Sequence, residues 1–139
     1  MVIVVTFPVS TMTPSAASLQ GMVRQINEAS FEYYARLARV RHHVDRSPAR
    51  VVSLNEAAQI ACLERKYFSA FFRAKIGIPF TEWQTSQRIR RAVDLLRSRD
   101  DSVSHVARAT GFSCTRTFER AFKRWVGTTP LQFKLRVRP

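Results

Sequence analysis

The chain has 139 residues, of which 45% are apolar, and only four glycines and six prolines. This composition excludes a low-complexity chain and argues against a turn-rich all-β fold. The formal net charge is +13, and most of it arises beyond residue 50, where seventeen basic residues stand against seven acidic ones. Such an excess suits a polyanionic partner, because each neutralised phosphate releases condensed counterions. Charge alone does not exclude the alternative, which is a soluble basic protein whose charged side chains are simply solvated at its surface.

The two cysteines, Cys62 and Cys114, lie far apart and have neither CxxC spacing nor accompanying histidines. We therefore expect no metal site and no cofactor. Two free thiols, with an apolar start that lacks the basic segment and cleavage site of a signal peptide, predict a cytoplasmic chain. That start is also too short to span a membrane. Cys114 is expected to be a buried small residue rather than a redox switch.

The first fifty residues are interpreted as an extension over 1–30 followed by the start of the main domain. Residues 1–13 predict a single edge strand or an unstructured start, and Pro14 suits the first turn of a helix. Apolar residues from Leu19 to Val40 recur at helical spacing, which predicts one long amphipathic helix or two consecutive ones ending near His43. Its later part, about 31–43, would be the first packing helix of a domain over 31–139.

From Ser53 onward, helix-end signals predict two helix-turn-helix units. Ser53 and Glu56 form a capping-box pattern. A helix over 54–60 follows, then a turn at 61–63 and a helix from about 64 to 76 that stops at Gly77. After a linking helix over about 80–98, the pattern recurs as a helix over 103–109, a turn at 110–112 and a helix over 115–126. The units span about 53–77 and 102–127, and Thr129 caps a final helix over about 130–135.

An internal repeat supports this organisation. Matching residues are 49 apart up to the turn and 50 apart after it, as in Ala58 and Ala107, Cys62 and Gly111, Phe68 and Phe118, Phe72 and Phe122, and Gly77 and Gly127. Gly111 supplies the positive φ that such a turn usually needs. Cys62 fills that position in the first copy and predicts a slightly strained or altered turn. The expected fold is all-α, with two helix-turn-helix subdomains joined by a long central helix and an extra N-terminal helical segment.

The second helix of each unit separates an apolar stripe from a polar face. The outward faces consist of Arg65, Lys66, Ser69, Ala70 and Arg73 in the first unit, and Thr115, Arg116, Glu119, Arg120 and Lys123 in the second, and all of these except Ala70 are candidate DNA contacts. A solvated helix face is the alternative, which the helix-turn-helix setting disfavours.

The side-chain chemistry suggests a role for each candidate. Arg116 and Arg120 can each donate two hydrogen bonds to guanine, and Glu119 can accept one from cytosine. Arg65 and Lys66 begin the first recognition helix, where residues typically contact base edges. Phosphate contacts position the protein on DNA without specifying sequence. They suit the basic residues nearer the C-terminal ends of the two recognition helices, which are Arg73, Lys123 and Arg124. A linking helix of about nineteen residues is roughly 28 Å long, near the ~34 Å between successive major grooves, which predicts that the two recognition helices occupy adjacent grooves. Because their exposed faces differ, the DNA site is expected to be asymmetric.

Residues about 51–136 resemble the DNA-binding domain of the AraC/XylS family of bacterial transcription regulators. The most specific stretch is GFSCTRTFERAFKRWVGTTPLQFK, and RIRRAVDLL, from Arg88 to Leu96, resembles the family's linking helix. The resemblance implies base contacts at Lys66, Ser69 and Ala70, and at Thr115, Arg116, Glu119 and Arg120. Many relatives carry arginine where this chain has Ala70, so recognition by the first unit is expected to be weaker or shifted to Arg65 and Lys66.

The resemblance also implies how such a chain is controlled. Many family members carry a ligand-sensing β domain, and fifty residues with helical character are too few for one. The chain therefore resembles the small MarA/SoxS type, which is controlled by abundance, and no small-molecule effector is expected. The family favours activation of transcription through contact with RNA polymerase.

Two other classes of function compete with DNA-binding regulation. In the first, the helix within 15–30 dimerises or docks a protein partner through Leu19, Met22, Val23 and Ile26, and DNA binding is secondary; packing on the main domain is the simpler alternative. In the second, the chain is an enzyme. His42 and His43 are adjacent and point to different helix faces, His105 stands alone, and no glycine-rich phosphate loop occurs. We therefore expect no enzymatic activity.

Overall fold

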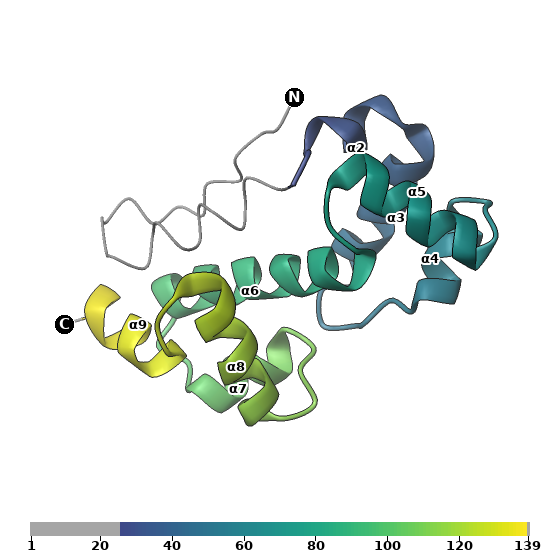
Figure 1. Ribbon diagram of the computed structural model, residues 1–139. Helices are drawn as coiled ribbons and strands as arrows, with labels where there is room; N and C mark the ends of the chain where they lie inside the picture. Colours follow the sequence, from purple (N-terminus) through teal and green to yellow (C-terminus); the bar gives the residue numbers. More distant parts are fainter. Residues whose placement is uncertain (1–25, 139) are drawn as a thin grey trace.

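The computed structural model describes residues 26–138, and every regular element among them is a helix. Two compact groups of helices lie at opposite ends of one long helix, α6 (Figure 1). This arrangement confirms the predicted all-α fold with a central linking helix. The helices are α2 (Ala29–Tyr33), α3 (Ala35–Arg46), α4 (Leu54–Ile60), α5 (Arg65–Ile76), α6 (Phe80–Ser98), α7 (Val103–Ala109), α8 (Thr115–Val126) and α9 (Pro130–Val137).

The first unit packs α2 to α5 around an aromatic core at the N-terminal end of α6. Phe31 lies 4.9 Å from Trp83 between ring centroids, and Phe72 lies 5.6 Å from the same indole. Phe68 and Phe80 are also fully or almost fully buried. These rings come from α2, α5 and α6, so burial of aromatic surface fixes the recognition helix α5 against the linking helix.

The second unit repeats this arrangement with α7, α8 and α9 at the other end of α6. Phe118 lies 5.2 Å from Phe112 and 5.7 Å from Phe122, and Phe133 of α9 lies 5.7 Å from Phe122. Trp125 completes the buried stripe of α8. The core stripe predicted for this helix is thus buried, except that Ala121 is only half-buried.

Residues 26–30, which the sequence placed in an N-terminal extension, pack against the first unit. Ile26 is 1% exposed, and the Asn27 amide donates a hydrogen bond to the Ile76 carbonyl at 2.7 Å. The Ser30 hydroxyl donates to the Lys75 carbonyl at 2.8 Å. The packed domain therefore begins at or before Ile26, and the boundary at residue 30 is too late. The predicted strand over 1–13 and most of the first amphipathic helix lie outside the described residues.

The helix ends follow the capping signals, with one correction. Ser53 and Ser102 accept hydrogen bonds from the third amides of α4 and α7, as expected. The Glu56 side chain, however, does not turn back to Ser53; it binds His43 Nε2 at 3.0 Å and Arg50 at 2.9 Å. Only half of that capping box forms, because two basic groups outcompete one backbone amide for the carboxylate.

The final helix starts as predicted and runs further. Thr129 and Gln132 make a complete capping box, Pro130 stands in its first turn, and α9 continues to Val137. In the described part of the N-terminal region, the second of the two expected arrangements is found: α2 and α3 are consecutive helices separated at Tyr34, and α3 ends at Arg46, slightly beyond His43. Within residues 26–138, no helix is both long enough and apolar enough to cross a lipid bilayer.

Candidate nucleic-acid interface

Each unit contains a short helix, a tight turn and a recognition helix, and the two turns have the same backbone path. Cys62 has a φ of 56° and Gly111 a φ of 87°, so both occupy the left-handed region. The following amides donate to equivalent carbonyls, Leu63 to Ala58 at 3.0 Å and Phe112 to Ala107 at 2.9 Å. The expected strain at Cys62 is confirmed, since a residue with a Cβ rarely adopts this conformation.

An arginine from the preceding long helix holds each turn. Arg36 of α3 donates to the carbonyls of Ala61 and Cys62 at 2.8 and 3.0 Å. Arg88 of α6 donates from Nε to the Thr110 carbonyl at 2.9 Å, and its guanidinium lies 3.7 Å from the centroid of the Phe112 ring. Burial lowers the pKa of Arg88 from its ordinary value, yet a guanidinium stays charged in a protein.

Sequence reasoning did not identify these arginines as supports for the turns. A signal was available, because Arg39 and Arg88 are 49 residues apart, the offset of the repeat. Arg39 also donates to the first turn, from Nε to the Ile60 carbonyl at 3.4 Å. The repeat therefore includes the long helix before each unit, and the structural unit is three helices rather than two.

Helix α8 presents a broad polar face to solvent. Phe118, Phe122 and Trp125 point into the core. The structure places four of the predicted residues fully on the exposed face and a fifth, Thr115, half-buried at its start; the exposed four are Arg116, Glu119, Arg120 and Lys123. Three cations and one carboxylate thus share one surface of the helix, which suits contacts with base edges and phosphates.

Helix α5 presents a face with fewer charged residues, three compared with four on α8. Arg65, Lys66, Ala70 and Arg73 are exposed, and Ser69 is half-buried. Tyr67, which the sequence did not single out, is 59% exposed beside these residues. Ala70 stands near the middle of the face, so the first unit offers fewer groups that could distinguish bases.

Arg124 differs from the other predicted contacts because it has an acidic partner. Its Nη2 lies 3.4 Å from Oε1 of Glu82, which belongs to α6. Both side chains are substantially exposed, so the pair is weak. Any phosphate contact by Arg124 would compete with this intramolecular ion pair.

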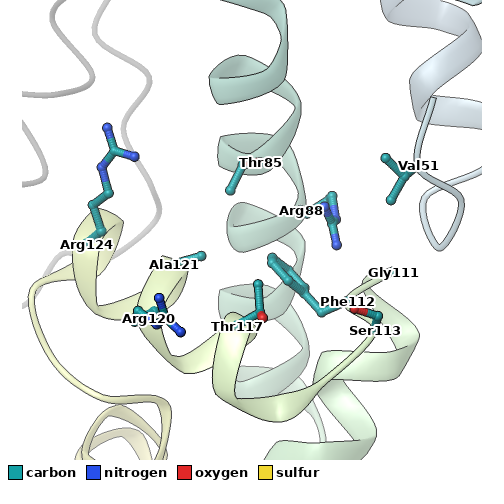
Figure 2. Close-up of a pocket in the computed structure, with 10 residues that line it drawn as sticks. All are labelled: Val51, Thr85, Arg88, Gly111, Phe112, Ser113, Thr117, Arg120, Ala121 and Arg124. Atoms are coloured by element: carbon teal, nitrogen blue, oxygen red, sulfur yellow. The ribbon is translucent and has the colours of Figure 1, made fainter. Parts of the chain in front are cut away.

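A groove runs between α6, the start of α8 and the connection that precedes α4 (Figure 2). Thr85 and Arg88 line it from α6, and Thr117 and Arg120 line it from α8. Val51, half exposed, closes the side nearest the first unit. The groove therefore combines cationic and hydroxyl side chains from α6 and α8.

Cys114 lies at the N-cap of α8, and the expectation of burial is wrong. The thiol is exposed, because an N-cap position lies outside the core-facing side of the helix; Glu64, the N-cap of α5, is exposed in the same way. Its sulfur accepts a hydrogen bond from the Thr117 amide at 3.5 Å and lies 3.1 Å from the Thr117 hydroxyl. These hydrogen bonds, the side-chain one foremost, lower the pKa of Cys114.

Two helix-turn-helix units on one linking helix, each with an exposed basic recognition helix, define the DNA-binding domain of a transcription regulator. A comparison with family models agrees: residues 57–136 match the model described as a helix-turn-helix domain. That is more than half of the chain. The chain belongs to this family and carries an AraC-type DNA-binding domain.

Similar proteins are regulators of transcription and not enzymes. The transcriptional regulator RipA of Corynebacterium glutamicum is 38% identical over 87 residues, which are 63% of this chain and 26% of that protein. The arabinose operon regulatory protein of Escherichia coli is 35% identical over 77 residues, 55% of this chain and 26% of that protein. The chain thus spans about a quarter of the length of these relatives. That this regulator has no sensor domain stays a prediction.

Solved structures share the fold. The DNA-binding domain of AdpA, crystallised with a target DNA, superposes with a TM-score of 0.70 at 27% identity and covers 74% of this chain and 93% of that one. An AraC-type regulator from Chromobacterium violaceum gives a TM-score of 0.72 at 18% identity, covering 77% and 96%, and supports the fold alone.

Proposed function

We propose that this chain binds double-stranded DNA in a sequence-specific manner and regulates transcription, with α5 and α8 in adjacent major grooves. The observation that carries the proposal is the equivalence of the two units: each places an exposed basic helix after the same arginine-supported turn. The solved complex of the AdpA domain with its target DNA supports this assignment.

The two units are proposed to contribute unequally. Arg116 and Arg120 would bind guanine edges and Glu119 a cytosine amino group, whereas α5 offers Arg65 and Lys66 at its start and Ala70 at its centre. Arg73 and Lys123 would contact phosphates. The second unit would therefore supply more of the base specificity, and the site would be asymmetric.

Further parts of the proposal rest on the family resemblance. Activation through contact with RNA polymerase and control without a small-molecule effector are inferred for this chain from regulators of that kind. A protein that acts on the chromosome would work in the cytoplasm, on the nucleoid. The alternative of a dimer or partner contact within 15–30 loses one of its residues, since Ile26 is buried in the domain.

Selection of bound duplexes from a random pool tests the proposal. We expect one asymmetric site spanning two successive major grooves, with stronger base preference in the half bound by α8. Affinity for that site should fall steeply with salt, with a log–log slope of several units. Recovery of no enriched sequence, or a slope near zero, would contradict sequence-specific DNA binding.

A further inference from the structure

Gly111 and Cys62 occupy equivalent positions, yet only one of them is glycine. Both have positive φ, 87° and 56°. Cys62 demonstrates that this turn can form around a residue that carries a Cβ. The left-handed conformation alone therefore does not explain why the second turn has a glycine.

The neighbourhood of Gly111 supplies the reason. A Cβ placed on Gly111 would lie 2.7 Å from the carbonyl oxygen of Ala49 and 3.1 Å from its carbonyl carbon. These are backbone atoms, which cannot turn aside as a flexible side chain can. Ala49 belongs to the connection between α3 and α4, in the first unit. Gly111 is thus the point at which the turn of the second unit touches the backbone of the first.

Two residues of α6 hold both sides of this contact. Gln84 exchanges two hydrogen bonds with Val52, three residues after Ala49, at 2.7 and 2.9 Å. Arg88, one helical turn further along α6, binds the Thr110 carbonyl at 2.9 Å. Residues four apart lie on the same helix face, so α6 brings the connection and the second turn side by side. Figure 2 shows Arg88, Gly111 and Val51 gathered at this junction.

Strain or motion at this junction would be passed to the recognition helix of the second unit. Helix α8 begins at Thr115, only four residues after Gly111. A displaced turn therefore changes the direction in which Arg116 and Arg120 point relative to α5. One base pair added between two half-sites moves the second by about 3.4 Å and rotates it by about 35°, which a fixed pair of helices cannot follow.

We propose that the contact between Ala49 and Gly111, held by Gln84 and Arg88, sets the spacing of the two DNA half-sites that this chain accepts. The inference rests on the proposed function and assigns a positioning role to Gly111 and Arg88. Neither residue needs to contact a base. Glycine is required at position 111 because the turn of the second unit packs there against the backbone of the first unit at Ala49. The turn at Cys62 belongs to the first unit itself.

The test measures affinity for the selected site and for versions with one or two base pairs added or removed between the halves. The unsubstituted 139-residue chain should lose at least about tenfold in affinity for each step away from its best spacing. Gly111→Ala should lose about tenfold at that spacing and flatten the profile or move its optimum. Gly127→Ala is the matched control, because Gly127 has a similar φ of 92° but lies at the far end of α8. It should lower all affinities by one factor, as simple destabilisation does.

Arg88→Met provides a second variant in case Gly111→Ala does not fold. It keeps the glycine and the aliphatic stem but removes the bond to Thr110, and it should also broaden the spacing profile. An unchanged profile shape in both folded variants overturns the inference and leaves the proposed function intact. Failure of the wild-type chain to select any duplex overturns the proposed function itself.

A measurement without DNA gives an independent readout. The chain has two cysteines, one in each unit and both exposed. Spin labels on Cys62 and Cys114 therefore report the distance between the units with no substitution. We expect one narrow distance distribution in the wild-type chain and in Gly127→Ala, and a broader or shifted one in Gly111→Ala and Arg88→Met. A broad distribution in the wild-type chain would also overturn the inference.

Discussion

Gln84 satisfies both backbone hydrogen-bonding groups of Val52, accepting from its amide at 2.7 Å and donating to its carbonyl at 2.9 Å. Gln84 is 4% exposed and Val52 is 1% exposed, so water cannot replace these bonds. The pair ties the segment before α4 to the linking helix, 32 residues away in sequence. It therefore supports the position of the whole first helix-turn-helix unit.

Replacing Gln84 by leucine should destabilise the protein strongly. Two buried backbone groups would lose their partners, at about 1–3 kcal/mol each, which predicts a loss of about 2–6 kcal/mol. Chemical denaturation monitored by tryptophan fluorescence measures it. Gln87→Leu, a half-buried glutamine on the same helix, is the control and should change stability by less than about 1 kcal/mol. Equal effects of the two substitutions would show that the amide pair adds nothing.

Replacing Arg116 and Lys123 by alanine should affect DNA binding in different ways. Arg116→Ala should weaken binding to the selected site by about 1–3 kcal/mol and relax preference at one base pair. Lys123→Ala should weaken binding to all sequences alike and reduce the salt slope by about one unit. Titrations on the selected site and on single-base variants of it separate the two. An Arg116→Ala protein with unchanged base preference would remove Arg116 from the set of base contacts.

The ion pair between Glu82 and Arg124 predicts a substitution that strengthens DNA binding. Glu82→Gln should release Arg124 for a phosphate contact, raising affinity and increasing the salt slope by about one unit. Asp94→Asn removes the same charge from an exposed position of the same helix and is the matched control. If the two variants gain affinity equally and share one salt slope, the effect is only that of net charge, and Arg124 has no special role.

Much of the fold could be predicted because its signals are local. Caps such as Ser53 and Thr129 and the stop at Gly77 depend on residues within one helical turn. From Leu54 onward, the start and end of each helix lie within a few residues of the prediction. The apolar spacing of each recognition helix also separates the core face from the exposed face without knowledge of the partner. Sequence was sufficient wherever the determining interaction lies within about four residues.

The remainder depends on contacts between distant segments. Gln84 and Arg88 act on residues 32 and 22 positions away, and nothing in their immediate surroundings distinguishes them from other polar residues of the linking helix. Glu56 fits a local capping pattern, yet it is bound by His43 from another helix. The exposure of Cys114 is a different case: its position at the N-cap of α8, equivalent to the exposed Glu64 at the N-cap of α5, decides it, and its small size does not.

The burial of Ile26 predicts where the domain can be shortened. A chain starting at residue 31 should be less stable than one starting at residue 26 by at least about 2 kcal/mol. It loses a buried isoleucine side chain, worth about 1.5–3 kcal/mol, and the Ser30 hydrogen bond to α5. Thermal unfolding of the two truncated proteins measures the difference. Equal melting temperatures would mean that residues 26–30 only cover the domain without stabilising it.

The thiol of Cys114 should react faster than an ordinary cysteine at neutral pH. Hydrogen bonds from Thr117 hold the pKa of Cys114 below its usual value of about 9, which raises the fraction of nucleophilic thiolate at pH 7. Alkylation by iodoacetamide, followed peptide by peptide across pH 6–10, should reach half its maximal rate at a pH below 9. Thr117→Val removes the side-chain hydrogen bond, which is the largest cause of the shift, and should move that midpoint upward and slow the reaction at pH 7. The rate at Cys62, also exposed, is the internal control, because Thr117→Val should leave it unchanged. A midpoint that does not move in Thr117→Val would mean that this hydrogen bond does not stabilise the thiolate.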